Sequence, residues 1–163
     1  PRVLQALEQV RARGVEVGWV IVGSKGWLYE GFLAQLEASP ARAAVRLPGY
    51  VPDADLPAVY GGAEALVMAS VYEGFGLPIL EAMACGTPVV SSSASSLPEL
   101  GGDAARYFDP YRADELAEAI AAVAQDRALR DEMNHRGLAQ AARFSWAAAA
   151  EQTMALYASL LAS

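Results

Sequence analysis

The chain has 163 residues, of which 54% are hydrophobic and 19% charged, a balance that suits one globular domain and excludes a disordered chain. The net charge of −7, without a basic stripe, argues against a nucleic-acid binder. The single cysteine, Cys85, excludes an internal disulfide, and the single histidine, His135, gives poor support to zinc sites or histidine-based triads. The longest apolar runs are too short to span a bilayer.

Patterns typical of helices and strands alternate along the chain. In chain order they predict a helix at residues 3–13, a strand at 15–22, a helix at 27–38, a strand at 45–47, a helix at 53–61, a strand at 65–69, a helix at 78–85, a strand at 88–91, a short helix near 97, a strand at 106–108, and helices at 114–124, 128–142 and 146–161. Strands separated by helices predict an α/β fold, a three-layer Rossmann-like domain whose parallel sheet is covered on both faces. Gly14 and Gly86 are placed to end the helices before them.

The chain has no initiator methionine and opens inside a helical pattern, so we expect residues 1–163 to be a single domain cut from a longer protein. In a parallel sheet, ligands bind outside the carboxyl ends of the strands. That rule selects three loops as candidate binding loops, at residues 24–26, 71–77 and 92–96.

The loop at residues 72–78 reads YEGFGLP and is the most informative of the three. Its two glycines let the backbone approach a ligand closely, and its proline suits the first turn of a helix. The free amides around Gly76, Leu77 and Ile79 would then point out of the helix start. That arrangement favours an anion such as a pyrophosphate.

Two glutamates flank this helix start with seven residues between them. Glu81 is the only charge in an apolar helix, and a carboxylate there can accept hydrogen bonds from two neighbouring sugar hydroxyls. Taken alone, the sequence is equally compatible with a Glu81 that faces solvent and binds no ligand. Glu73, taken alone, is an ordinary loop carboxylate. The combination of glycines, helix start and paired acids at the end of a strand favours a binding site.

Residues 73–90, with the sequence EGFGLPILEAMACGTPVV, resemble the hallmark segment of group 1 (family 4) glycosyltransferases. The flanking features that agree are Gly49-Tyr50-Val51 followed by Leu56 and Tyr60, the Ser95–Leu100 turn with Pro98-Glu99, and Phe144-Ser145-Trp146. The resemblance covers essentially the whole chain. It implies the C-terminal domain of a two-domain GT-B enzyme, which binds a nucleotide-diphosphate sugar and transfers the sugar to an acceptor hydroxyl with retained configuration.

The resemblance also implies roles for individual residues. Glu81 would bind the ribose hydroxyls of the donor, and Glu73, the catalytic residue, would contact and position the transferred sugar. The other donor-binding residues would be Gly74, Phe75, Gly76 and Leu77, which line the sugar and diphosphate, and Tyr50 and Val51, which flank the base.

Members of this family clamp the diphosphate with an arginine and a lysine on the loop after the first strand of the domain. Both residues should lie just upstream of Pro1, so we expect the chain to lack that strand as well as the N-terminal acceptor domain. Losing two charge-assisted contacts would cost about 1.5–3 kcal/mol each. Lys25 is a candidate replacement for the clamp, although a solvated turn lysine is an equally good interpretation.

No metal and no cofactor are expected beyond the nucleotide-sugar substrate. The acceptor, a sugar, a lipid-linked glycan or another hydroxyl compound, would be bound by the missing domain, and the isolated chain is expected to be inactive. The resemblance implies a cytoplasmic protein of cell-envelope polysaccharide synthesis, peripherally associated with the inner face of the membrane as a full-length protein. The Gly-Trp after Lys25 and the Glu73 loop resemble mannosyl- and rhamnosyl-type members, which favours guanosine diphosphate mannose as donor.

Several other residues are interpreted as structural. Asp53 and Asp55 spell a D-x-D pattern that could hold a metal, but Asp53 is better placed as the N-cap of a helix. Ser96 and Glu99 match a capping box. The remaining candidates for structural roles are Cys85 and the tryptophans 27 and 146 as packing residues, the alanine-rich final helices as packing elements, and His135 as a surface residue.

Other functions remain open at this point. The first is a binding module without catalysis, either a degenerate transferase domain or a flavodoxin-like regulatory domain. A receiver-type domain would need acidic residues at the end of the first predicted strand, where this chain has Gly23-Ser24-Lys25. Sugar-nucleotide epimerases of similar fold would be expected to show more catalytic acids and histidines than this chain contains.

Overall fold

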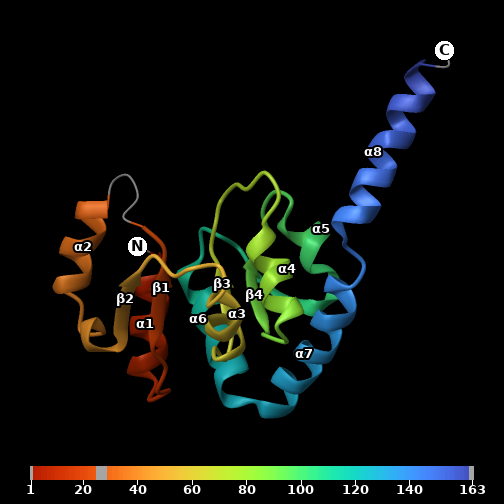
Figure 1. Ribbon diagram of the computed structural model, residues 1–163. Helices are drawn as coiled ribbons and strands as arrows, with labels where there is room; N and C mark the ends of the chain where they lie inside the picture. The colour runs from red at the N-terminus through yellow and green to blue at the C-terminus, as the bar shows by residue number, and fades with distance from the viewer. Residues whose placement is uncertain (1, 25–28, 162–163) are drawn as a thin grey trace.

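The computed structural model describes residues 2–24 and 29–161. Its strands form two parallel sheets with helices packed around them (Figure 1). The strands are β1 (Trp19–Val22) and β2 (Val45–Gly49) in one sheet, and β3 (Leu66–Met68), β4 (Val89–Ser92) and β5 (Ala105–Phe108), in this order, in the other. Each printed strand pair is parallel, which confirms the predicted α/β class. The predicted sheet is divided between β1 and β3, which do not pair.

Eight α-helices are assigned within the described residues. They are α1 (Arg2–Ala12), α2 (Tyr29–Glu37), α3 (Leu56–Gly61), α4 (Leu77–Ala84), α5 (Leu97–Gly101), α6 (Ala113–Gln125), α7 (Arg127–Ala141) and α8 (Trp146–Leu161), with 3-10 turns at Arg42–Ala44 and Gly102–Ala104. Most predicted bounds lie within a few residues of these. Gly14 and Gly86 adopt φ of +81° and +73°, which confirms that they end α1 and α4.

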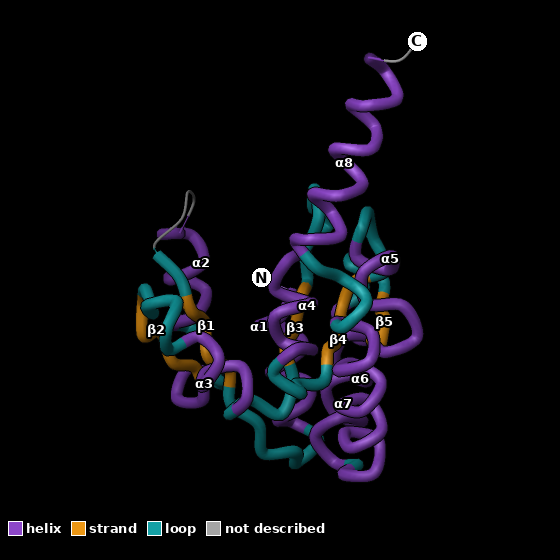
Figure 2. The backbone as a smooth tube through the Cα atoms, turned by 45° about the vertical axis from the view of Figure 1, so that its right-hand side comes forward, coloured by secondary structure: helices purple, strands orange, loops and turns teal. Residues whose placement is uncertain are grey.

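Helix α1 packs against both halves of the molecule. Its Leu4 and Leu7 belong to a buried cluster that also includes Val45 of β2, and partly buried side chains of β1 pack against that cluster. Its Ala6 and Val10 belong to a second cluster with residues of α6 and β4. Because one helix contributes to both clusters, α1 bridges the two sheets, which lie apart in Figure 2.

Strand β4 is the most deeply buried strand, since all four of its residues are buried. It lies between β3 and β5. Helix α4 packs on this sheet through Ile79, Ala82 and Met83, which share a third buried cluster with Val89 of β4. The loops that precede α4 and α5 therefore start from neighbouring, firmly packed strands.

The expectation that the final helix and Trp146 serve packing is wrong for the described chain. Helix α8 projects away from the body (Figure 1), and none of its described residues is buried. Its exposed large apolar side chains are Trp146, Met154, Leu156, Tyr157, Leu160 and Leu161. Helical spacing of apolar residues creates an apolar face, but it does not say what that face contacts.

None of the helices within the described ranges has the length and apolar character needed to cross a membrane.

Candidate functional site

The loops after β3 and β4 meet at the carboxyl edge of their sheet. The Ser95 hydroxyl donates to the carbonyl oxygen of Glu73 at 2.6 Å, and the Ser96 hydroxyl donates to that of Phe75 at 2.7 Å. Ser95 has φ of +57°, a left-handed conformation that non-glycine residues rarely adopt. Such a strained backbone is maintained only where surrounding contacts hold it. The two serines therefore join the loops into one unit.

These hydroxyl contacts set the direction of the neighbouring amides. In a trans peptide the C=O and N–H bonds point in opposite directions. Because the carbonyls of Glu73 and Phe75 point at the serines, the N–H groups of Gly74 and Gly76 point away from them. Ser96 is thus occupied by a loop contact and makes no side-chain cap of α5, so the predicted capping box is wrong. The Ser96 hydroxyl bonds to the distant Phe75 carbonyl instead of to the first turn of α5.

Unpaired amides gather where α4 begins. Gly76 is the N-cap, and no side chain caps this end of the helix. Among the described residues, no hydrogen bond is donated by the N–H groups of Gly74, Phe75, Gly76 or Leu77. The predicted free amide of Ile79 is wrong, because it donates to the carbonyl of Gly76 at 3.0 Å. The remaining N–H groups lie at the positive end of the helix dipole, where anions are stabilised.

One oxygen of the Glu73 carboxylate is hydrogen-bonded to a neighbouring side chain, and the other is not. Its Oε1 accepts a hydrogen bond from the Ser70 hydroxyl at 2.7 Å. The Ser92 hydroxyl donates to the Ser70 carbonyl at 2.6 Å, which ties the end of β3 to β4. Within the described part of the chain, Oε2 of Glu73 has no hydrogen bond and no cation pairs with the carboxylate. One oxygen is therefore held while the other can accept ligand hydroxyls.

Glu81 is exposed on α4, so the structure agrees with the interpretation in which its carboxylate faces solvent. Its Oε2 accepts a hydrogen bond from the Tyr60 hydroxyl of α3 at 2.8 Å. Partial burial, followed by the hydrogen bond to Glu81, raises the pKa of the Tyr60 hydroxyl above its ordinary value. The Thr87 hydroxyl donates to the Tyr60 carbonyl at 2.7 Å and fixes this tyrosine from the other side.

The two glutamates belong to the same edge but do not touch. Glu81 follows Leu77 by four helical residues, a rise of about 6 Å along the axis of α4. Glu73 lies before the helix start, next to Ser70. Each carboxylate has its own hydroxyl partner, and the unpaired amides of the helix start lie between them in the chain. A ligand that contacts both acids would have to extend along this end of α4.

The other candidate residues lie on separate segments. Tyr50 and Val51 follow β2, and the Tyr50 side chain is 68% exposed. Lys25 lies outside the described residues. The prediction of Asp53 as N-cap is wrong, because α3 begins at Leu56 with Asp55 in the cap position and without a side-chain cap bond. The Asp53 carbonyl instead accepts a turn hydrogen bond from the Leu56 N–H, and α3 begins three residues later than predicted.

Several contacts of this site escaped sequence reasoning. Residues 92–96 were a candidate loop, but the hydrogen bonds of Ser92 and Ser95 were not predicted, because their partners lie 22 residues away in the chain. The contact of Ser70 with Glu73, three residues away, was not predicted either. The only signal was the density of serines at the ends of two strands. His135 is exposed, as expected, whereas Cys85 is only half-buried. No group of three metal-binding side chains occurs within the described residues.

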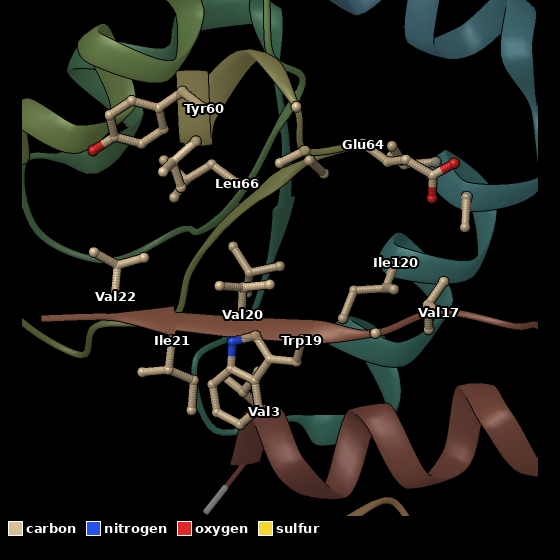
Figure 3. A pocket seen from close by; sticks show the side chains of 18 of the residues that line it. Val3, Val17, Trp19, Val20, Ile21, Val22, Tyr60, Glu64, Leu66 and Ile120 are labelled. Carbon is tan, nitrogen blue, oxygen red and sulfur yellow. The ribbon is translucent and has the colours of Figure 1, made fainter. Parts of the chain in front are cut away.

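A cavity of about 860 Å³ lies between β1 and β3 rather than at this edge (Figure 3). Its walls include Val20, Val22, Tyr60, Leu66 and Val67. None of the candidate donor-binding residues in the described chain lines it. The candidate site is therefore the open surface at the start of α4, and the cavity is a separate feature.

Residues 1–140 match the family described as glycosyl transferases group 1. The chain is 44% identical over 138 residues to the O-antigen chain mannosyltransferase B of Escherichia coli, covering 85% of this chain and 36% of that protein. It is 33% identical over 165 residues to the MMP alpha-(1->4)-mannosyltransferase of Mycolicibacterium hassiacum, covering 98% of this chain and 39% of the relative. The chain thus spans well under half the length of these relatives.

Solved structures agree on the fold. The sucrose-phosphate synthase of Thermosynechococcus elongatus superposes with a TM-score of 0.86 at 26% identity, over 99% of this chain and 43% of that one. The Anabaena protein HepE, solved in complex with UDP-glucose, superposes with a TM-score of 0.80 at 23% identity, over 95% of this chain and 44% of that one. At that identity the second likeness supports the GT-B fold alone.

We expect Gly76→Ala to lower the free energy of unfolding by about 1–3 kcal/mol. Gly76 has φ of +112°, and a Cβ there would lie 2.6 Å from Cδ2 of the buried Leu97. The matched control is Gly74→Ala, because no atom lies within 4 Å of a Cβ at Gly74 and no left-handed φ is recorded for it. Urea unfolding of both variants measures the difference, and equal stabilities would contradict the geometry described for the helix start.

Proposed function

Because the chain belongs to the group 1 glycosyltransferases, we propose that it forms the donor-binding part of a retaining enzyme. That enzyme transfers a sugar from a nucleotide-diphosphate sugar to an acceptor hydroxyl. The observation that carries the proposal is the set of unpaired amides at the start of α4, flanked by two carboxylates. An anion and two groups of hydroxyls are the ligands that such a surface would satisfy.

The diphosphate would lie at the start of α4. The N–H groups of Gly74 and Gly76 are directed away from the serines that hold their neighbouring carbonyls. Together with the N–H of Leu77 they would donate hydrogen bonds to phosphate oxygens. Hydrogen bonds to a charged acceptor are shorter and roughly twice as strong as neutral ones. The bulk of Phe75, which is 48% exposed, would cover one side of the bound donor.

The two carboxylates would hold the two ends of the donor. Glu73, with one oxygen fixed by Ser70, would accept hydrogen bonds from hydroxyls of the transferred sugar through the other oxygen. Glu81, with Oε2 engaged by Tyr60, would accept hydrogen bonds from the ribose through Oε1. Tyr50 and Val51 would flank the base, and Lys25 would contribute to the phosphate contacts.

Catalysis would rest on positioning and on stabilisation of the leaving group. The acceptor oxygen would form its bond to the anomeric carbon on the face that the diphosphate leaves, as retention of configuration requires. The bond from that carbon to the phosphate oxygen breaks, negative charge collects on the diphosphate, and the proton of the acceptor hydroxyl passes to the departing diphosphate. Amides already directed at that charge would stabilise it more in the transition state than in the ground state. Neither a metal nor a further cofactor is part of this proposal.

The proposed sugar is mannose, with guanosine diphosphate mannose as the favoured donor. Support comes from the names of the two relatives described above, both of them mannosyltransferases. The proposed acceptor is a hydroxyl of a polysaccharide or of a lipid-linked glycan, bound by chain outside residues 1–163. In this proposal the full-length protein works in the cytoplasm, peripherally at the inner face of the membrane.

We predict that Glu81→Ala weakens binding of guanosine diphosphate mannose by the full-length protein about 10- to 100-fold. The estimate assumes that a carboxylate hydrogen bond contributes about 1.5–3 kcal/mol. Isothermal titration calorimetry measures the affinity. Glu118→Ala, which removes an exposed glutamate on α6, is the matched control and should bind as the wild type does. Unchanged affinity of Glu81→Ala would remove this residue from the site.

Glu73→Gln in the full-length protein should lower kcat about 100-fold while KM changes less, since the carboxylate is proposed to position the transferred sugar for reaction. Ser70→Ala should lower kcat about tenfold, because the carboxylate loses the hydroxyl that orients it. Ser70→Thr retains the hydroxyl and should recover most of that loss. Wild-type kcat in Glu73→Gln would disprove the assignment.

The purified chain of residues 1–163 should transfer no sugar, whereas the full-length protein should. The physical reason is that, in this proposal, the acceptor binds to other parts of the polypeptide; the chain's coverage of only 36% and 39% of two relatives supports the proposal. Release of nucleoside diphosphate in the presence of acceptor measures the activity. Turnover by the 163-residue chain would show that the acceptor binds within these residues.

A further inference from the structure

The Tyr60 side chain reaches from α3 to α4 and contacts one of the two candidate donor-binding carboxylates. Its hydroxyl donates to Oε2 of Glu81 at 2.8 Å, across 21 residues of chain. The tyrosine ring packs against the buried cluster that contains Ile79 and Met83 of α4. The hydroxyl is therefore held at Glu81 by a ring that packs on the same helix.

The backbone of Tyr60 is fixed as well. The hydroxyl of Thr87, which is 2% exposed, donates to the Tyr60 carbonyl at 2.7 Å. The Thr87 N–H donates to the Ala82 carbonyl at 2.9 Å, so this threonine joins the carboxyl ends of α3 and α4. A Cβ placed on Gly61 would lie 3.8 Å from the Cys85 carbonyl oxygen, an ordinary contact between the two helix ends. Tyr60 is thus fixed at both its ring and its carbonyl.

Glu81 is exposed and has no second anchor. Within the described ranges it forms no ion pair, and its Oε1 accepts no hydrogen bond. An exposed glutamate without partners populates many rotamers, so binding a ligand to one of them costs conformational entropy. The Tyr60 hydroxyl removes part of that cost before a ligand arrives. A carboxylate has about four acceptor positions, and the bond to Oε2 leaves both positions of Oε1 for ligand hydroxyls.

We propose that Tyr60 is a positioning residue, whose hydroxyl sets the orientation in which Glu81 accepts the two ribose hydroxyls of the donor. This role rests on the proposed function, in which Glu81 binds the ribose. Tyr60 does not touch the donor and acts through the carboxylate. Without the tyrosine hydroxyl, Glu81 still reaches the ribose but adopts the binding orientation only part of the time.

The same orientation determines selectivity for ribose over 2′-deoxyribose. A carboxylate held in one orientation by Tyr60 does not turn to follow a single remaining hydroxyl, so a 2′-deoxy donor leaves one acceptor position of Glu81 unpaired. A site that is built to bind a hydroxyl rejects the analogue that lacks it. Because Glu81 is exposed, water partly replaces the lost hydroxyl, and the discrimination is on the order of tenfold.

Isothermal titration calorimetry of the full-length protein with guanosine diphosphate and its 2′-deoxy analogue tests this role. The wild type should bind guanosine diphosphate about tenfold more tightly than the analogue. Tyr60→Phe keeps the ring and removes the hydroxyl. It should weaken binding of guanosine diphosphate about fivefold, and binding of the analogue less than about twofold. Unchanged discrimination in Tyr60→Phe would overturn the proposal.

Steady-state kinetics of the same variant distinguishes positioning of the ribose from a part in the chemical step. In Tyr60→Phe the KM for guanosine diphosphate mannose should rise about fivefold while kcat stays near the wild-type value, because the ribose contact is made equally in the ground state and the transition state. A fall in kcat at unchanged KM would contradict the role assigned to Tyr60.

Tyr107→Phe is the matched control for loss of a tyrosine hydroxyl. The Tyr107 hydroxyl donates to the Gly102 carbonyl at 3.0 Å, and Tyr107 contacts none of the candidate donor-binding residues through it. This variant should bind both nucleotides as the wild type does, at a temperature where urea unfolding shows that both tyrosine variants are folded. A loss of discrimination in Tyr107→Phe as large as that in Tyr60→Phe would overturn the specific role of Tyr60.

Glu81→Ala separates failure of this role from failure of the proposed function. It should abolish the discrimination, and adding Tyr60→Phe should change neither affinity further, since the tyrosine acts only through the carboxylate. If Glu81→Ala kept the wild-type discrimination, the ribose contact would be wrong, and the role of Tyr60 with it. If Glu81→Ala lost the discrimination and Tyr60→Phe kept it, only the role of Tyr60 would be wrong. Additive losses in the double variant would also overturn that role.

Discussion

The hydroxyls of Ser95 and Ser96 hold two carbonyl oxygens of the loop before α4, and the proposed chemistry depends on this contact. A planar trans peptide cannot direct its C=O toward one loop without directing its N–H the other way. The amides of Gly74 and Gly76 are therefore fixed before any ligand arrives. An anion that binds there does not have to reorganise the backbone, which is the condition for effective electrostatic stabilisation of developing charge.

The two glutamates of the candidate site lie at the same edge of the sheet, and each is oriented by a hydroxyl partner. Glu73 follows β3 and is oriented by Ser70, which is itself tied to β4 through Ser92. Glu81 and Tyr60 form a second fixed pair on α4 and α3.

Much of this arrangement could be predicted from local patterns. The apolar periodicity and the glycines marked the helices and strands, and the bounds of α8 were predicted as the structure has them. The glycine loop before a helical proline marked the site. What local patterns could not supply was the contact between loops. Ser96 matched a capping box, yet its hydroxyl bonds to Phe75, more than twenty residues away. The exposed face of α8 escaped prediction for the same reason, because what an apolar helix face contacts does not depend on its neighbours in sequence.

The most direct test of the central claim is the response of individual amides to a nucleoside diphosphate. In the full-length protein labelled with ¹⁵N, titration with guanosine diphosphate should shift the amide resonances of Gly74, Gly76 and Leu77 most strongly. The amide of Gly86, at the opposite end of α4, serves as the internal reference. Large shifts confined to the start of α4 would agree with a diphosphate held by these N–H groups. Saturating binding that leaves these three resonances unmoved would contradict the account.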